Sequence, residues 1–98
     1  MEKPLVSVIM GVHNQWDEKI LLAAVDSILK QSYTFFEFII CNDGSHPHVT
    51  QKVNDLIKLD DRIIIVGQEE NKGLAFSLNE CIRLAKGKYI ARMDSDDI

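Results

Sequence analysis

The sequence predicts an α/β fold of three layers, in which helices cover both faces of a mostly parallel sheet. Short apolar segments rich in β-branched residues alternate with segments whose apolar residues recur at helical spacing. The resulting β-α-β-α-β-α-β order is typical of parallel sheets with helices on their faces. No internal repeat, low-complexity segment or linker interrupts it, so residues 1–98 are expected to form a single domain.

Four strands are expected, at residues 6–10, 35–41, 62–66 and 88–93. The first three are short, continuous apolar runs, and each is followed by polar or glycine-containing turn residues. Runs of this length and composition favour strands that are buried within a sheet.

Three helices are expected between the strands, near residues 20–29, 49–57 and 74–85. Each segment carries apolar residues three or four positions apart, as one face of a helix requires. Gly87 is placed to end the third helix in a left-handed conformation. The apolar stripe of that helix consists of Leu74, Leu78, Ile82 and Ala85.

Composition favours a cytoplasmic protein that binds no nucleic acid. Eleven basic and fifteen acidic residues give a net charge of −4, which argues against a polyanionic partner. Cys41 and Cys81 lie in apolar segments and are expected to be buried free thiols, as in a reducing compartment. No stretch reaches the roughly 18–20 apolar residues of a membrane span, and no secretory signal peptide is expected, because no long apolar run follows the first charged residues.

Polar clusters follow all four predicted strands: 11–14, 42–45, 71–73 and 94–97. Because the carboxyl ends of parallel strands share one edge of a sheet, these clusters are expected to form a ligand site there. The last cluster holds three carboxylates within four residues, a set of hard oxygen ligands that suits Mg²⁺ or Mn²⁺. Neither the phosphate loop of P-loop NTPases nor the GxGxxG of dinucleotide-binding domains is present.

The order of these segments resembles family 2 glycosyltransferases of the GT-A fold. An Asp-x-Asp motif alone is weak support, but several segments in the family's order cover nearly the whole chain. The matching segments are Val6–Met10, Asn14, Ser27–Tyr33, Asn42–Ser45, Asn71–Gly73, Ala85–Ala91, and Asp94 with Asp96.

The resemblance implies a Rossmann-like, nucleotide-binding half of a transferase that uses a nucleotide-diphospho-sugar, most often a UDP-sugar. Asp43 matches the family carboxylate that contacts uracil. Asp96 matches the metal ligand, and Asp94 matches the residue that contacts the ribose or the water shell of the metal. The cofactor would be Mn²⁺ or Mg²⁺. The full set of implied nucleotide-binding residues is Gly11, His13, Asn14, Asp43, Asn71, Gly73 and Asp94.

The implied reaction is sugar transfer with inversion at the anomeric carbon, to a glycan or lipid-linked acceptor in bacterial surface polysaccharide synthesis. In the family the catalytic base follows the Asp-x-Asp motif, so it is expected beyond residue 98. These 98 residues are therefore expected to bind nucleotide without transferring sugar. The full-length protein would be cytoplasmic and could work at the inner face of the membrane. Apolar surface that packs on a missing half would favour self-association.

Some positions depart from the family pattern, and two other functions stay open. Gly11 and His13 stand where Pro and Tyr are common, Asn42 replaces an Asp, and Leu78 replaces an Arg. Asp43 could serve only to shape its turn. A metal-binding receiver-like or flavodoxin-like module without transferase activity is the main alternative. A nucleotidyltransferase is the other alternative, although such enzymes need a basic, glycine-rich loop after the first strand, and residues 11–14 contain no Lys or Arg.

Overall fold

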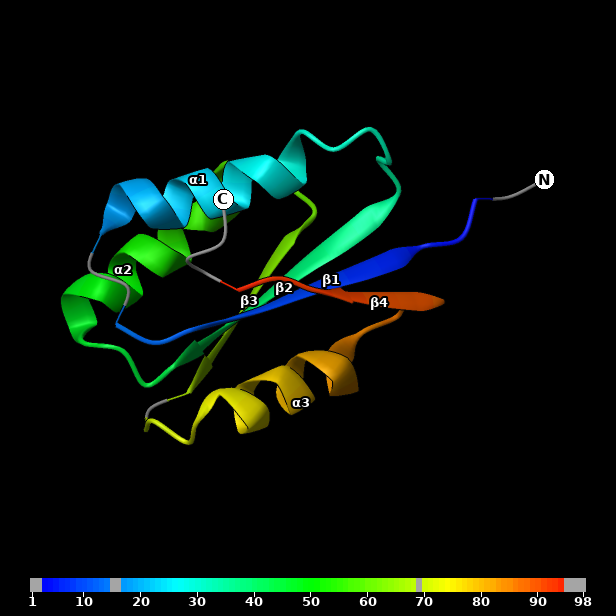
Figure 1. Ribbon diagram of the computed structural model, residues 1–98. Coiled ribbons are helices and arrows are strands. Elements are labelled where there is room, and N and C mark those ends of the chain that lie inside the picture. The colour runs from blue at the N-terminus through cyan, green and yellow to red at the C-terminus, as the bar shows by residue number, and fades with distance from the viewer. Residues whose placement is uncertain (1–2, 15–16, 69, 95–98) are drawn as a thin grey trace.

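The computed structural model describes residues 3–14, 17–68 and 70–94, and its four strands form one parallel sheet (Figure 1). The strands are β1 (Val6–Val12), β2 (Phe36–Asp43), β3 (Ile63–Gln68) and β4 (Tyr89–Arg92). Their order across the sheet is β3-β2-β1-β4, and every neighbouring pair is parallel. The predicted α/β class and the predicted order of elements are therefore confirmed.

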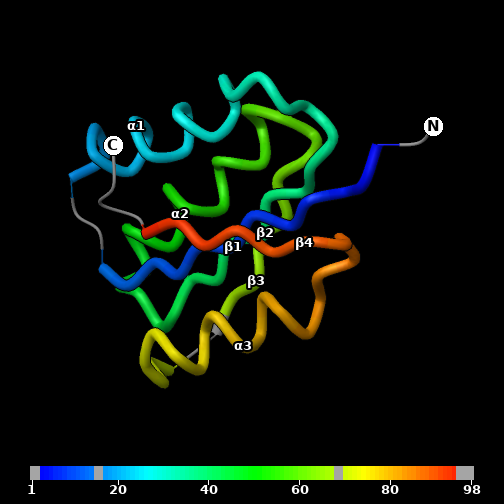
Figure 2. The backbone as a smooth tube through the Cα atoms, turned by 45° about the vertical axis from the view of Figure 1, so that its right-hand side comes forward, coloured from blue at the N-terminus to red at the C-terminus, as the bar shows by residue number. Residues whose placement is uncertain are grey.

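Three helices connect the strands: α1 (Glu18–Leu29), α2 (Pro47–Asp55) and α3 (Leu74–Leu84). A short 3₁₀ turn at Leu56–Lys58 extends α2. α1 and α2 cover one face of the sheet, and α3 covers the other, which gives three layers (Figures 1 and 2). Within the described residues, no helix has the length and apolarity that crossing a membrane requires.

Successive residues of the central strands point to opposite faces of the sheet, and two apolar clusters result. Val8, Met10 and Val12 of β1 belong to the larger cluster, with α1 and α2. Ile9 lies on the opposite face, where it joins Cys81 of α3 in the smaller cluster. The sheet is therefore buried on both sides at its centre, as the continuous apolar runs predict.

The same alternation brings Gly11 and Asp43 to the α3 face, at the carboxyl end of the sheet. Gly11 follows Ile9 by two residues, and a Cβ atom built on it would lie 2.8 Å from Leu74 Cδ1. Asp43 follows Cys41 by two residues and is only 3% exposed. The start of α3 thus packs directly over the place where a strand-end site is predicted.

Both central strands extend further than the sequence predicts. β1 continues through Gly11 and Val12, and β2 continues through Asn42 and Asp43. The parallel ladder pairs Gly11 with Cys41 and Val12 with Asn42, so the polar residues keep backbone partners. Gly11 was expected in a loop, and this is wrong: Gly11 and Asp43 both belong to strands, which hold a site more rigidly than loops do.

The face of α3 that packs on the sheet coincides only in part with its apolar stripe, because Leu78 and Ala85 pack against the smaller cluster. Ser77 and Cys81 are fully buried, whereas Leu74 and Ile82 are 46% and 45% exposed. α3 lies over β1 and β2, so its apolar side projects beyond them. That side, with half-buried Leu78, lines a groove of about 470 Å³ next to β4.

Gly87 is required for a different reason from the one that the sequence suggests. The prediction that it ends α3 in a left-handed conformation is wrong, because α3 ends at Leu84 and the φ of Gly87 is not left-handed. A Cβ atom at Gly87 would lie 2.6 Å from the backbone nitrogen of Ser7. The Gly87 N–H donates to Ser7 Oγ at 2.8 Å, and Ser7 Oγ donates to Glu37 Oε2 at 2.6 Å. These contacts of Gly87 with Ser7 fix the start of β4 against β1.

Cys41 and Cys81 are buried free thiols, as predicted. Cys81 Sγ lies 3.6 Å from the carbonyl oxygen of Ile39, on the α3 face of the sheet. A hydrogen bond with Cys41, together with burial, raises the pKa of the Cys81 thiol above its ordinary value. Cys81 therefore stays a neutral thiol at physiological pH and packs as a small apolar residue.

Candidate functional site

The loops that follow β1, β2 and β3 meet at one edge of the sheet, where the sequence predicts a ligand site. Asn14, after β1, bonds to the segment Ser45–His46, which follows β2. Asp43, at the end of β2, bonds to the backbone of Lys72 and Gly73, which precede α3. Hydrogen bonds between these loops, and not only proximity, therefore define the site.

Asp43 is the best-anchored side chain of the site. Its Oδ1 accepts the Lys72 N–H at 2.7 Å, and its Oδ2 accepts the Gly73 N–H at 2.9 Å. Asn71 Oδ1 accepts the same Gly73 N–H at 3.0 Å, so the turn before α3 is fixed twice. A carboxylate offers about four lone-pair directions, and two remain for another donor.

His13 lies beside Asp43 with one ring nitrogen already engaged. His13 Nδ1 is 2.7 Å from the carbonyl oxygen of Asp43. Because a carbonyl oxygen can only accept, Nδ1 must carry the hydrogen of this bond. In the neutral ring Nε2 is then an acceptor, and it lies 3.5 Å from Asn14 Nδ2. The exposed edge of the ring can accept a hydrogen bond from a hydroxyl group.

Asn14 connects two loops and does not line the cavity. Its φ of 47° is left-handed, a conformation that asparagine tolerates better than most residues. Its N–H donates to Ser45 Oγ at 2.9 Å, and its Oδ1 accepts the His46 N–H at 2.7 Å. Asn14 thus ties the end of β1 to the start of α2. Its predicted nucleotide contact stays a prediction.

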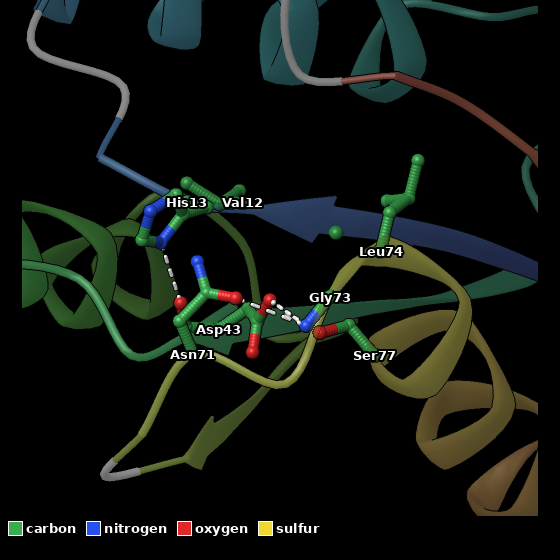
Figure 3. A pocket seen from close by; sticks show the side chains of 8 residues that line it. Val12, His13, Asp43, Asn71, Gly73, Leu74 and Ser77 are labelled. Carbon is green, nitrogen blue, oxygen red and sulfur yellow. Dashed lines mark hydrogen bonds between the residues drawn. The ribbon is translucent and has the colours of Figure 1, made fainter.

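A cavity of about 230 Å³ lies between the end of the sheet and the first turn of α3 (Figure 3). Five of the seven predicted nucleotide-binding residues line it, and they come from three separate segments of the chain. Asn14 and Asp94 are the two that do not. Figure 3 shows α3 side chains facing those of the β1 and β2 ends across this space. The lining residues are Gly11, Val12, His13, Asp43, Asn71, Gly73, Leu74 and Ser77.

Sequence reasoning missed Val12, Leu74 and Ser77 as lining residues. Leu74 and Ser77 share one face of α3 because they are three residues apart, and a Cβ atom built on Gly11 would lie within 4 Å of both. A signal was present in the sequence, since Ser77 is a hydroxyl-bearing residue between Phe76 and Leu78. Whether Ser77 lines a cavity or faces solvent depends on which face of the helix contacts the sheet, and the sequence does not give that.

Two departures from the family pattern lie outside the cavity. Asn42 is buried and points to the α2 side, where its Nδ2 donates to Thr50 Oγ1 at 2.9 Å. Thr50 Oγ1 in turn donates to the carbonyl oxygen of Ser45 at 3.2 Å. Leu78 lines the groove beside β4. Asn42 therefore supports the loop after β2 from behind.

The end of β4 presents the predicted metal motif only in part. The Met93 N–H donates to the carbonyl oxygen of Ile9 at 2.9 Å, so backbone bonding to β1 continues to Met93, the residue before Asp94. The Asp94 side chain is 46% exposed, and its Oδ1 accepts from Arg92 Nη2 at 3.1 Å. Asp96 and Asp97 lie outside the described residues. In the part of the chain that the structure describes, no three His, Cys, Asp or Glu side chains are grouped to hold a metal.

Comparisons with known proteins identify relatives of this chain. A family model described as Glycosyl transferase family 2 matches residues 7–98. EpsE of Bacillus subtilis is 43% identical to this chain and is matched over 97% of it. WfgD of Escherichia coli, named a UDP-Glc:alpha-D-GlcNAc-diphosphoundecaprenol beta-1,3-glucosyltransferase, is 38% identical over all of it. The chain spans about a third of the length of these relatives, 34% of EpsE and 37% of WfgD.

A solved structure shares the fold. The mannosyltransferase PcManGT from Pyrobaculum calidifontis, in complex with GDP-Man and Mn²⁺, superposes with a TM-score of 0.84 at 23% identity. The superposition covers 97% of this chain and 28% of the mannosyltransferase. The three-layer parallel arrangement is thus the fold of a known glycosyltransferase, in agreement with the resemblance to the GT-A fold. With the match of the family model over almost its whole length, the chain belongs to the family 2 glycosyltransferases.

Proposed function

We propose that this chain is the nucleotide-binding part of a glycosyltransferase and that its cavity holds the uracil base of a UDP-sugar. The observation that carries the proposal is the buried Asp43 carboxylate, which two backbone N–H groups fix at the cavity wall. A carboxylate accepts the ring N–H of uracil, whereas cytosine presents an acceptor at that ring position. The cavity of about 230 Å³ is smaller than the roughly 300 Å³ or more of drug-sized ligand sites, so it suits a base alone.

The other lining residues would shape the nucleoside site. Gly11 keeps the space open, because a side chain there would meet Leu74. Asn71 and Gly73 form the opposite wall, next to Asp43. His13 Nε2 would accept a hydrogen bond from a ribose hydroxyl. Asn14 would act through the loop that it holds in place.

We place the divalent cation at the end of β4, held by Asp94 and Asp96. Asp94 suits this role, since it offers a half-exposed carboxylate two residues after the end of β4, the strand next to β1. A bound Mn²⁺ or Mg²⁺ would offset the negative charge that develops on the departing diphosphate. Before a ligand binds, Arg92 balances the charge of Asp94.

The proposed reaction of the whole protein is sugar transfer with inversion in bacterial surface polysaccharide synthesis. Support comes from WfgD, whose name gives a UDP-Glc donor and a diphosphoundecaprenol-linked acceptor. A glycan or lipid-linked acceptor is therefore proposed here too. The catalytic base is proposed to follow residue 98. The receiver-like or flavodoxin-like alternative is not favoured, because the family model matches residues 7–98.

Replacing the carboxylates of the Asp-x-Asp motif is expected to weaken UDP binding when a metal is present. Calorimetric titration with Mn²⁺ should show about a tenfold or greater loss in Asp94→Asn and in Asp96→Ala, because each removes a charged ligand. A chelator should weaken binding to the wild-type chain to the same level. Asp26→Asn is the matched control, since the exposed Asp26 lies on α1, where its carboxylate forms an ion pair with Lys30 at 2.9 Å. Equal UDP affinity with Mn²⁺ and with chelator would reject the metal site.

We also propose that the chain associates with a second copy through its β4 edge. β4 is an edge strand of the described sheet and is exposed along its length, beside an apolar groove that includes Ile82 and Ile90. Exposed edges of this kind pair readily with other chains. Sedimentation should show a dimer that Ile90→Lys converts to a monomer, while Leu22→Lys on α1 leaves it unchanged. A wild-type monomer at high concentration would contradict the proposal.

A further inference from the structure

The Ser77 hydroxyl is buried and has no hydrogen-bond partner among the described residues. Ser77 is 0% exposed, and its Oγ is one of two buried side-chain atoms in the described part of the chain without such a partner. Leaving a buried hydroxyl unpaired destabilises a fold. An unpaired buried hydroxyl beside a cavity is a candidate for binding a ligand.

A comparison within the chain shows that the unpaired state of Ser77 is not a general property of its helical serines. Ser27 of α1 donates its Oγ–H to the carbonyl oxygen of Ala24, three residues earlier, at 2.7 Å. That bond is the common way in which a helical serine satisfies its hydroxyl. Ser77, near the start of α3, makes no such bond, although its own N–H donates to the Gly73 carbonyl at 3.1 Å.

The Ser77 hydroxyl lies on the same cavity as the Asp43 carboxylate. Both residues line the cavity, Ser77 from α3 and Asp43 from the end of β2. In Figure 3 the Ser77 oxygen points from the helix toward the side of the cavity where the Asp43 carboxylate lies. Gly11 also lines the cavity, and a Cβ atom there would lie 3.6 Å from Ser77 Cβ, so Gly11 is the part of β1 next to Ser77. The wall thus offers a carboxylate that only accepts and a hydroxyl that can donate.

We propose that Ser77 is a specificity-determining residue that donates a hydrogen bond to a uracil carbonyl, next to the ring N–H that Asp43 accepts. This inference rests on the proposed function, in which the base lies beside Asp43. Uracil presents an N–H between two carbonyl groups, which matches an acceptor and a donor side by side. Cytosine would place its ring nitrogen, an acceptor, against the carboxylate. Ser77 and Asp43 together would therefore recognise two neighbouring atoms of one base edge.

The test combines a change in the protein with a change in the ligand. UDP, 4-thio-UDP and 2-thio-UDP are titrated with Mn²⁺ into the wild-type chain and into Ser77→Ala. Sulfur accepts hydrogen bonds weakly, so the wild-type chain should bind one thio analogue about tenfold more weakly than UDP. Ser77→Ala should bind UDP about tenfold more weakly and should not distinguish that analogue from UDP. The comparison between the two proteins cancels the effect of sulfur on the acidity of the ring N–H.

Stability provides a second readout that separates ligand recognition from a structural role. Ser77→Ala removes an unpaired buried hydroxyl, so the unfolding midpoint without ligand should stay the same or rise. Ser27→Ala is the control for loss of a helical serine hydroxyl, and because Ser27 is exposed on α1 it should change neither the midpoint nor the UDP affinity appreciably. A loss of stability in Ser77→Ala with unchanged discrimination between UDP and its thio analogues would overturn the inference.

The remaining outcomes distinguish this inference from the proposed function. If the wild-type chain binds UDP and Asp43→Asn abolishes that binding, but Ser77→Ala binds all three ligands as the wild type does, only the role of Ser77 is rejected. If the folded wild-type chain binds none of the three ligands, both the uracil site and the role of Ser77 are rejected.

Discussion

Gly44→Ala is expected to destabilise the chain by about 3 kcal/mol or more, because two independent costs act at this position. Gly44 has a φ of 59°, in the left-handed region that a side chain disfavours. A Cβ atom there would also overlap the backbone of Glu70 and Asn71. Backbone atoms of a fixed turn cannot move aside as a flexible side chain can. The loss is large against the roughly 5–15 kcal/mol that holds a typical domain folded.

Urea unfolding of three glycine variants separates these costs. Gly73 has a φ of 94° but open space around it, so Gly73→Ala should show only the cost of strain, about 1–3 kcal/mol. Gly67 in β3 has neither a left-handed φ nor a neighbour within 4 Å of a built Cβ, so Gly67→Ala should be neutral or slightly stabilising. Equal stabilities of Gly44→Ala and Gly67→Ala would show that the turn adapts freely and would contradict the close packing described above.

Gly44→Ala should also weaken UDP binding more than Gly73→Ala does. The displaced turn carries the Lys72 and Gly73 N–H groups that hold the Asp43 carboxylate. Moving these donors would release Asp43 from its fixed position at the cavity wall. Binding measured in a buffer where both variants remain folded tests this difference directly.

Local sequence patterns predicted the fold because its elements have distinct periods. Short β-branched runs mark the strands, and residues such as Val49 and Val53, both buried, mark a helix face. The ends of the strands were not predictable in the same way. Gly11 and Asn42 continue the strands only because a parallel partner lies beside them, and that pairing joins residues about thirty positions apart.

The edge that holds the site was also predictable, since polar residues after parallel strands must share it. The rotation of α3 about its axis was not. The sequence indicates that Leu74, Leu78 and Ile82 face the core. In the structure Ser77 and Cys81 are the fully buried residues of α3, whereas Leu74 and Ile82 are 46% and 45% exposed and Leu78 is only half-buried. Packing of α3 over β1 and β2 decides that rotation, which is why Ser77 could not be assigned to the cavity beforehand. The metal role of Asp96 stays a prediction, because Asp96 lies outside the described residues.

Asp43→Asn is expected to reduce both stability and nucleotide selectivity, although it changes neither the size nor the shape of the side chain. The amide keeps one acceptor oxygen, so its NH₂ group must face either the Lys72 or the Gly73 N–H. One buried hydrogen bond is lost and two donors oppose each other, at a cost of about 2–3 kcal/mol of unfolding free energy. Urea unfolding measures this loss of unfolding free energy, and Asp26→Asn, at an exposed position of α1, should cause almost no loss.

The effect on binding decides between the two roles that Asp43 can have. If its carboxylate accepts the uracil N–H, Asp43→Asn should bind UDP about tenfold or more weakly and should lose its preference for UDP over CDP, because an amide can offer either a donor or an acceptor. If Asp43 only shapes the turn before α3, the folded variant should bind more weakly but keep the same ratio of UDP to CDP affinity. Titrations of both nucleotides under conditions where the variant is folded therefore separate base recognition from support of the loop. A retained ratio would assign the selectivity to another part of the cavity and would reject Asp43 as the group that recognises uracil.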